Sequence, residues 1–133
     1  MALDVEGLCP LFEIFDMPRA IAFYRDLLGF KVVATSEPGD DCDWALLKLN
    51  NVELMLNTAY EKNERPIAPD PARVAAHRDT ALFFGCRDLD EAYSQLRARG
   101  LEVKEPVTRD YGMRQLSFAD PDGYSLCLQW PAA

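Results

Sequence analysis

The sequence has no apolar run long enough to cross a bilayer, and its N-terminus has no basic segment followed by an apolar one. We therefore expect a cytoplasmic protein with no membrane partner. Basic residues are the minority, with 14 Lys and Arg against 22 Asp and Glu, which gives a formal net charge of −8. Nucleic-acid binding needs clusters of Lys and Arg, so this charge argues against a nucleic-acid partner. It would suit a cationic ligand, although a solvated acidic surface explains it more simply.

Histidine and paired cysteines are also scarce. His77 is the only histidine, and the four cysteines (Cys9, Cys42, Cys86 and Cys127) contain no C-x-x-C pair. In a cytosolic chain of this size, reduced thiols are expected rather than a disulfide framework. With 49% hydrophobic and 27% charged residues, the 133-residue chain can form a packed core. We expect one domain.

A strong hairpin signal lies between Tyr111 and Trp130. Residues 113–118 and 124–130 alternate with a period near two, which is typical of strands. The segment 120–123, DPDG, has the composition of a β-turn. Its proline presets φ, its aspartates can accept hydrogen bonds from nearby backbone N–H groups, and its glycine can adopt positive φ. We therefore predict two antiparallel strands joined by a tight turn.

The rest of the chain predicts the same kinds of element twice. In chain order they are strand 8–15, a helix from the N-cap Asp16 to Gly29, strands 31–35, 44–49 and 52–58, strand 80–86, a helix from the N-cap Asp88 to Gly100, and strand 101–103. Residues 36–43 predict a polar loop. Residues 59–79, which contain three prolines, predict a linker with one short helical turn around 72–76.

The two halves have equal spacing. The N-caps are separated by 88 − 16 = 72 residues, and the last turns of the halves, at 50 and 122, are also separated by 122 − 50 = 72. A repeated unit with one constant shift indicates two similar modules that pack side by side. We place the first module at about 8–58, the linker at about 59–79 and the second module at about 80–130.

The run FYRDLLGFKVV, the hairpin YGMRQLSFADPDGYSLCLQW and the doubled β-α-β-β-β order resemble the vicinal oxygen chelate superfamily. That superfamily includes glyoxalase I, bleomycin resistance proteins, fosfomycin resistance enzymes and extradiol dioxygenases. The resemblance implies an α+β fold of two βαβββ modules that form a cupped mixed sheet (the glyoxalase/bleomycin resistance-like fold), with a small-molecule ligand in the cup. It also implies a homodimer, with the cup formed within one chain or between two. In enzymes of the group, His, Glu or Gln on the first and last strands of each module hold a divalent metal.

The four positions that match those metal ligands carry other residues here. Cys9 and Ala81 each lie seven residues before an N-cap aspartate, Cys127 lies four residues after the turn glycine, and Met55 is its mate in the repeat, since 127 − 55 = 72. Alanine donates nothing, and two thiols with a thioether suit hard or borderline metals poorly. We therefore expect no metal cofactor and regard the three sulfur residues as pocket lining. A divalent metal with unusual ligands, or Cu(I), is the alternative, and His77 is expected on the surface.

Further cup residues are predicted from strand parity and from aromatic area. Glu13 and Glu53 share the parity of Cys9 and Met55, so they either face the cup or meet water at a sheet end. The expected ligand-binding residues are Cys9, Glu13, Trp44, Glu53, Met55, Asn57, Phe83, Tyr111, Met113, Gln115 and Cys127, with Tyr60 and Trp130 as further candidates. A slip of one residue in register would place Arg114 in the cup instead of Gln115.

Two functions follow from these residues. The first is a binding protein of the bleomycin-resistance type, which sequesters a small organic molecule, aromatic or cationic, without a metal. The second is a glyoxalase- or dioxygenase-like enzyme (a lyase, isomerase or dioxygenase) with a non-standard metal or thiol site. Cys9 or Cys127 could act as a nucleophile only if a nearby cation or helix N-terminus lowered its pKa. The missing metal ligands favour the binding protein.

Overall fold

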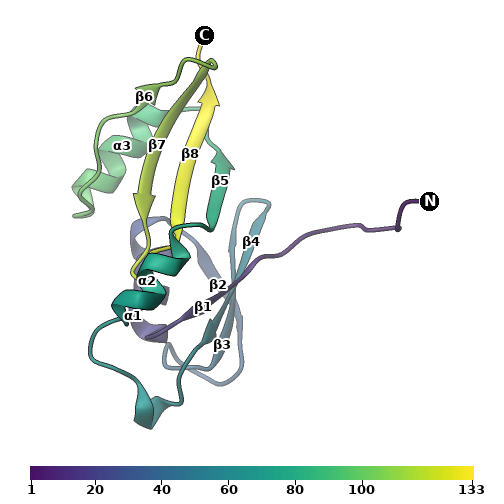
Figure 1. Cartoon of the computed structure of the whole chain (residues 1–133), viewed down its shortest axis with the longest axis vertical. Coiled ribbons are helices and arrows are strands. Elements are labelled where there is room, and N and C mark those ends of the chain that lie inside the picture. The colour runs from purple at the N-terminus through teal and green to yellow at the C-terminus, as the bar shows by residue number, and fades with distance from the viewer.

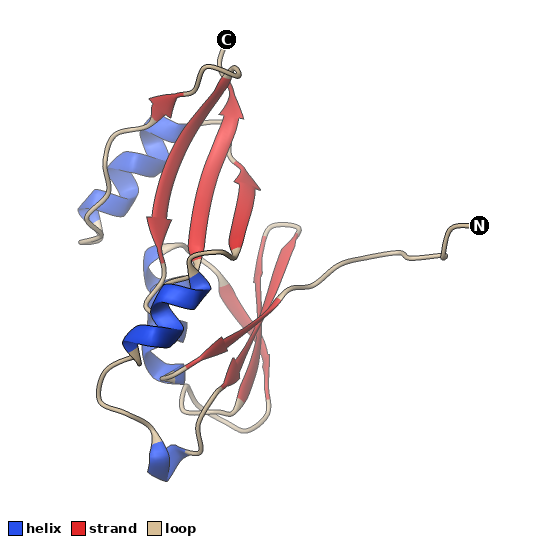
Figure 2. Ribbon diagram, in the orientation of Figure 1, coloured by secondary structure: helices blue, strands red, loops and turns tan.

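Two four-stranded mixed sheets form the framework of the computed structural model, which describes residues 1–133 (Figures 1 and 2). The first sheet has the order β1-β4-β3-β2, from strands Leu11–Ile14 (β1), Lys31–Thr35 (β2), Trp44–Leu49 (β3) and Val52–Thr58 (β4). The second has the order β5-β8-β7-β6, from Ala81–Gly85 (β5), Val107–Thr108 (β6), Met113–Ala119 (β7) and Ser125–Pro131 (β8). β1 is parallel to β4 and β5 is parallel to β8, while the other pairs are antiparallel. The predicted α+β fold of two βαβββ units is confirmed.

The helices begin where the sequence predicts. Asp16 caps α1 (Met17–Ile21), which continues through a π-helical segment, Ala22–Leu27, and Asp88 caps α3 (Leu89–Ala98). The Asp16 carboxylate accepts a hydrogen bond from the Arg19 N–H at 3.2 Å, and the Asp88 carboxylate accepts one from the Glu91 N–H at 3.0 Å. No helix combines the length and the apolar composition needed to cross a membrane.

Two predicted strands differ from the structure. The first begins at Leu11 rather than at residue 8, because Pro10 has no N–H to donate to the neighbouring strand. The predicted strand at 101–103 is wrong, and the strand that pairs with β7 is β6. Leu101 and Val103 alternate with an exposed Glu102 because they pack beside Leu89 and Leu96 of α3, not because they pair with a strand.

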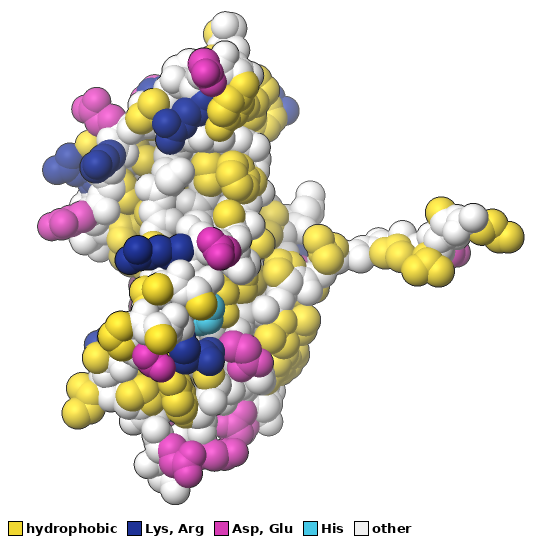
Figure 3. Space-filling model, viewed as in Figure 1, with side chains coloured by type: hydrophobic (Ala, Val, Ile, Leu, Met, Phe, Trp, Pro, Cys, Tyr) yellow, Lys and Arg dark blue, Asp and Glu magenta, His cyan; other side chains and the backbone are white.

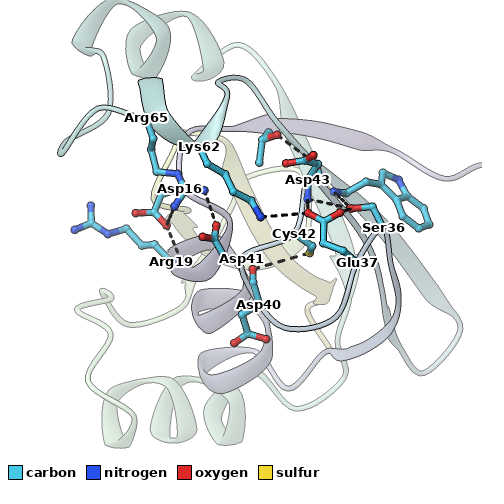
Figure 4. Close-up of polar contacts among 12 residues, drawn as sticks. Asp16, Arg19, Ser36, Glu37, Asp40, Asp41, Cys42, Asp43, Lys62 and Arg65 are labelled. Carbon is cyan, nitrogen blue, oxygen red and sulfur yellow. Dashed lines mark hydrogen bonds and ion pairs between the residues drawn. The ribbon is translucent and has the colours of Figure 1, made fainter.

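The segment between the modules is more ordered than the predicted linker. It contains a 3₁₀ turn, Lys62–Glu64, and a seven-residue helix, α2 (Pro71–His77), in place of one short turn. Its basic side chains contact the acidic loop 36–43, as Figure 4 shows. The Arg65 guanidinium lies 2.6 Å from an Asp41 carboxylate oxygen, and Lys62 Nζ lies 3.5 Å from Glu37. The charged residues that predicted a linker therefore form ion pairs that hold this segment against the first module.

One hydrophobic core joins the two modules. Its buried residues come mainly from the first sheet and its helix, and Tyr124 and Leu126 of the second module belong to the same cluster. The turn between β7 and β8 makes two buried hydrogen bonds across this junction. Asp120 accepts a 2.6 Å hydrogen bond from the Tyr24 hydroxyl, and Asp122 accepts a 2.8 Å hydrogen bond from the Phe15 N–H. The predicted turn therefore also fastens the second module to the first.

Three stacked rings extend this junction toward α2. The Tyr124 ring lies between Phe12, at 3.8 Å, and His77, at 4.0 Å, with all planes nearly parallel. The His77 Nδ1 atom is 2.7 Å from the Asp122 carbonyl oxygen. The prediction of a surface histidine is therefore wrong, because His77 is half-buried at the end of α2.

The buried Asp122 makes stability depend on pH. Its pKa is raised from 3.8 to about 7, first by burial and also by the charge of Asp120, and its Oδ2 atom has no hydrogen-bond partner. Between the unfolded pKa, about 3.9, and the folded one, only the folded chain keeps this proton, so stability falls as pH rises through that interval. We expect Asp122→Asn to remove this fall and to raise the free energy of unfolding at pH 8 by about 2 kcal/mol. This is less than the roughly 4 kcal/mol that the full shift would give, because the buried amide of asparagine would also lack a hydrogen-bond partner at the position of Oδ2.

Urea unfolding at pH 5 and pH 8 measures this effect. Asp79→Asn, at an exposed position just after α2, is the matched control and should keep the wild-type dependence on pH. Equal losses of stability between pH 5 and pH 8 in wild type and in Asp122→Asn would show that Asp122 does not hold the proton.

Candidate binding site

Each sheet has one face covered by helices and one open face. On β1 the buried Phe12 and Ile14 alternate with Leu11 and Glu13, and Leu11 is 44% exposed where Phe12 is 3% exposed. On β5 the outward residue is Phe83, which is 58% exposed. Large apolar side chains rarely gather on an open sheet face unless it binds something. The open faces are therefore the candidate site.

The first sheet presents its open-face residues in rows across the strands. Paired residues in neighbouring strands point to the same face, so the register defines these rows. One row is Leu11, Met55 and Leu46, the next is Glu13, Asn57 and Trp44, and a third pairs Glu53 with Lys48. The apolar row therefore lies between two polar rows.

The two glutamates of this face differ in their surroundings. Asn57 Nδ2 donates a 3.2 Å hydrogen bond to Glu13 Oε1, and Glu13 is half-buried. Glu53 is exposed opposite Lys48. Of the two predicted alternatives, Glu13 fits the first, because the Asn57 amide holds it on the open face. Glu53 fits the second, because it is exposed to water.

The second sheet repeats this arrangement. Phe83 and Cys127 lie in one row with Ser117, and Gln129 pairs with Gln115 in the next. Gln115 Nε2 donates a 3.0 Å hydrogen bond to Gln129 Oε1.

The side-chain oxygen of Gln115, Oε1, has two hydrogen-bond donors. It accepts hydrogen bonds from the Tyr111 hydroxyl at 3.2 Å and from Arg109 Nε at 3.1 Å. Arg114 is on the opposite face, 2.7 Å from Asp90 of α3. The register therefore places Gln115, not Arg114, on the open face.

A hollow of about 580 Å³ lies at one end of the open face of the second sheet. Ala81, Phe83, Ser117 and Cys127 line its sheet side, and Val74 of α2 lines another wall. This volume is within the range of roughly 300–1,000 Å³ that is typical of small-molecule sites. Met113 lies farther along the same face, opposite Pro131.

Sequence reasoning missed some open-face residues and misplaced others. Gln129 was missed, although the repeat could have found it, since 129 − 57 = 72 relates it to Asn57. Trp130 was a wrong candidate, because it pairs with Arg114 on the opposite face of the sheet. Its ring centroid lies 4.6 Å from the Arg87 guanidinium. Tyr60 lies just beyond the sheet, where the Arg73 guanidinium is 5.9 Å from its ring.

The four positions that the resemblance associates with metal binding do not fit a divalent ion. Ala81 has no donor atom and Met55 offers only a thioether. Cys9 lies beside the first sheet, and Cys127 is on the second. No group of three or more His, Cys, Asp or Glu side chains is close enough to hold a metal ion. These four positions offer two thiols, a thioether and a methyl group where the resemblance associates metal binding with carboxylate, amide or imidazole groups.

The thiols have no feature that would activate them as nucleophiles. The pKa of Cys9 is raised, first by burial and then by the nearby charge of Glu53, which disfavours the reactive thiolate. Cys127 is 5% exposed, and its thiol has one hydrogen-bond partner, the Leu128 carbonyl oxygen at 3.7 Å. His77, which could act as a base, is held in the stack with Tyr124.

The open faces belong to separate sheets within one chain. No strand of the first sheet pairs with a strand of the second, and β1 and β5 each have one edge without a partner strand. Figures 1 and 2 show the two sheets in different halves of the molecule, with the N-terminal segment extending away from both.

Comparisons with known proteins agree with this architecture. TnmS3, an antibiotic binding protein from Streptomyces sp. CB03234, is 22% identical with a TM-score of 0.70, covering 98% of this chain and 100% of that one. A glyoxalase/bleomycin resistance protein/dioxygenase from Nocardioides is 20% identical with a TM-score of 0.73, covering 98% and 87%. TioX from Micromonospora sp. ML1 is 16% identical with a TM-score of 0.72, covering 94% and 98%. At these identities the likeness shows the fold.

The sequence itself carries the family assignment. The family model of the Glyoxalase/Bleomycin resistance protein/Dioxygenase superfamily matches residues 14–128, which run from the end of β1 into β8. That range contains most of both modules and the whole segment between them. The chain therefore belongs to the Glyoxalase/Bleomycin resistance protein/Dioxygenase superfamily.

Proposed function

We propose that this protein binds and sequesters a small organic molecule on its open sheet faces, without a metal and without catalysis. The observation that carries the proposal is the hollow beside Phe83, whose lining includes Ala81 and Cys127, two of the four positions where metal-binding relatives would carry a ligand. The antibiotic-binding TnmS3, with the same fold, supports a role in binding such compounds. The enzyme alternative has less support, because neither the donor set nor the thiols suit catalysis.

The chemistry of the faces favours a planar aromatic ligand with polar groups at its edge. Exposed Phe83 and half-buried Trp44 offer ring surfaces for stacking. The amide of Gln129 lies one row from Phe83, and that of Asn57 lies in the same row as Trp44; both can donate or accept hydrogen bonds. Glu13 adds an acidic group that would favour a cationic substituent.

We further infer that a second copy of the chain completes the cup. β1 and β5 have free edges, and Leu11 and Phe83 beside these edges are exposed. The N-terminal segment projects from the body with Leu3 and Val5 uncovered (Figure 3). A homodimer that joins the first sheet of one copy to the second sheet of the other would cover these apolar surfaces and enclose a ligand from both sides.

Fluorescence titration and thermal unfolding test the proposal. A panel of planar aromatic antibiotics, with ethidium and anthraquinone-2-sulfonate as cationic and anionic compounds, should include ligands that quench Trp44 and raise the melting temperature. Phe83→Ala should weaken their binding about tenfold, because a phenylalanine ring stacked on an aromatic ligand contributes about 1.5 kcal/mol. Ile67→Ala removes another apolar side chain, 96% exposed in a loop, and should leave binding unchanged.

Sedimentation equilibrium on the same samples should give twice the chain mass, 15.0 kDa per chain. A melting temperature that only divalent metals raise would contradict the metal-free proposal. A monomer that binds aromatic ligands at full affinity would contradict the shared cup and leave the binding function standing.

A further inference from the structure

A second cavity lies between the modules on the helix-bearing side of the sheets, with a volume of about 350 Å³. The end of the first helix, the turn between β3 and β4, the end of β5 and one face of α3 surround it. Ten of its 15 lining residues are hydrophobic, among them Leu27, Phe30, Val52, Phe84, Ala92 and Leu96. None of its lining residues lines the hollow beside Phe83. The cavity is therefore a separate site, and it does not depend on the function proposed above.

Arg99 is the only charged residue that lines this cavity. Arg99, after the end of α3, donates a 2.8 Å hydrogen bond from Nη1 to the Leu27 carbonyl oxygen. Unlike Arg25, Arg65 and Arg114, it forms no ion pair with a carboxylate. The other polar groups are amides, of which Gln95 is one, and no acidic side chain lines the cavity.

We propose that this cavity binds a small amphipathic anion, with an apolar body among the hydrophobic walls and a carboxylate at the Arg99 guanidinium. The volume is at the lower end of the range of small-molecule sites, which suits a medium-chain carboxylate. The guanidinium keeps free N–H donors that match a carboxylate in geometry and charge. An anion is selected here although the whole chain is acidic, because local charge decides recognition at an apolar site.

The same cavity couples ligand binding to the packing of the modules. Its walls include Leu49 and Val52 from the first module and Phe84 and Leu128 from the second. A ligand in contact with both sets of walls binds only when the modules are packed together. It therefore stabilises the folded chain by mass action.

Decanoate, with decanol as the neutral analogue, is the probe for the wild-type protein. Decanoate should raise the melting temperature and bind at least tenfold more tightly than decanol in calorimetric titration. Cys86 lines the cavity and Cys9 lies by the first sheet's open face, so alkylation followed by peptide mapping reports the site. Decanoate should slow the alkylation of Cys86 and leave the rate of Cys9 alkylation unchanged. Protection of Cys9 alone, or of neither thiol, would overturn the proposal.

Two variants separate charge from shape. Arg99→Gln should weaken decanoate binding about tenfold and leave decanol binding unchanged. Arg97→Gln is the matched control and should bind decanoate as wild type does. Arg97 lies two residues before Arg99, in the last turn of α3, but it donates a hydrogen bond to the Tyr93 hydroxyl and does not line the cavity. Ala92→Phe should fill the cavity and abolish the effect of decanoate on the alkylation of Cys86. Equal effects of Arg99→Gln and Arg97→Gln would overturn the role of Arg99, whether or not Ala92→Phe folds.

Discussion

Replacement of Asp120 by alanine should lower the free energy of unfolding by about 4 kcal/mol. The Asp120 carboxylate is buried in the turn that joins the modules and accepts hydrogen bonds from the Tyr24 hydroxyl, at 2.6 Å, and from the backbone N–H groups of Asp122 and Tyr124, both at 2.9 Å. Alanine would leave these donors without partners, at a cost of about 1–3 kcal/mol each. Burial raises the pKa of Asp120, so removal of the carboxyl also relieves a desolvation cost and keeps the loss below the sum.

Urea unfolding at pH 7 measures this loss. Asp110→Ala, in the exposed turn before β7, is the matched control and should change the free energy of unfolding by less than about 0.5 kcal/mol. Tyr24→Phe removes only one of the donors and should cost about 1–2 kcal/mol. If Asp120→Ala cost no more than Tyr24→Phe, the turn would not be the polar junction between the modules.

Gly123→Ala should destabilise the protein by about 3 kcal/mol, for a different reason. Gly123 has a φ of +89°, and a Cβ atom there would lie 2.6 Å from the Val74 carbonyl oxygen and 2.8 Å from Val74 Cγ1. Because Val74 belongs to α2, the helix would have to move away from the turn. The variant therefore combines backbone strain with the loss of α2 packing.

Gly112→Ala is the matched control, because Gly112 has the same φ of +89° and no heavy atom within 4 Å of the added Cβ. It should cost only the strain of a left-handed residue, about 1 kcal/mol. Chemical denaturation of both variants gives the difference, expected at about 2 kcal/mol. Equal costs would mean that α2 does not press on the turn in solution.

The fold was predictable where structure depends on near neighbours in the chain. Asp16 and Asp88 cap helices through N–H groups three residues away, and strands 44–49 and 52–58 were predicted to the residue. The strand predicted at 101–103 failed, because alternation there reflects packing beside α3. Periodicity records which side chains are buried, but it does not say what buries them.

The candidate site was predictable only in part. Phe83, Cys127 and Gln115 were predicted to face the cup, and the register places all three on one face of the second sheet. Trp130 was misplaced because aromatic area carries no information about direction, and the neighbouring Gln129 faces the site instead. The cavity at Arg99 had no signal in the sequence, since its walls come from segments far apart in the chain.

The sequence by itself determined the two β-α-β-β-β modules, the tight turn at 120–123 and the residue types at Ala81 and Met55, because these depend on residue type and local spacing. Only the tertiary structure decided that the turn joins the modules through Tyr24 and Phe15, and that α2 packs on Gly123. It also decided that the open faces lie on separate sheets. The physical reason is that contacts between distant segments arise from packing and desolvation, which no local pattern encodes.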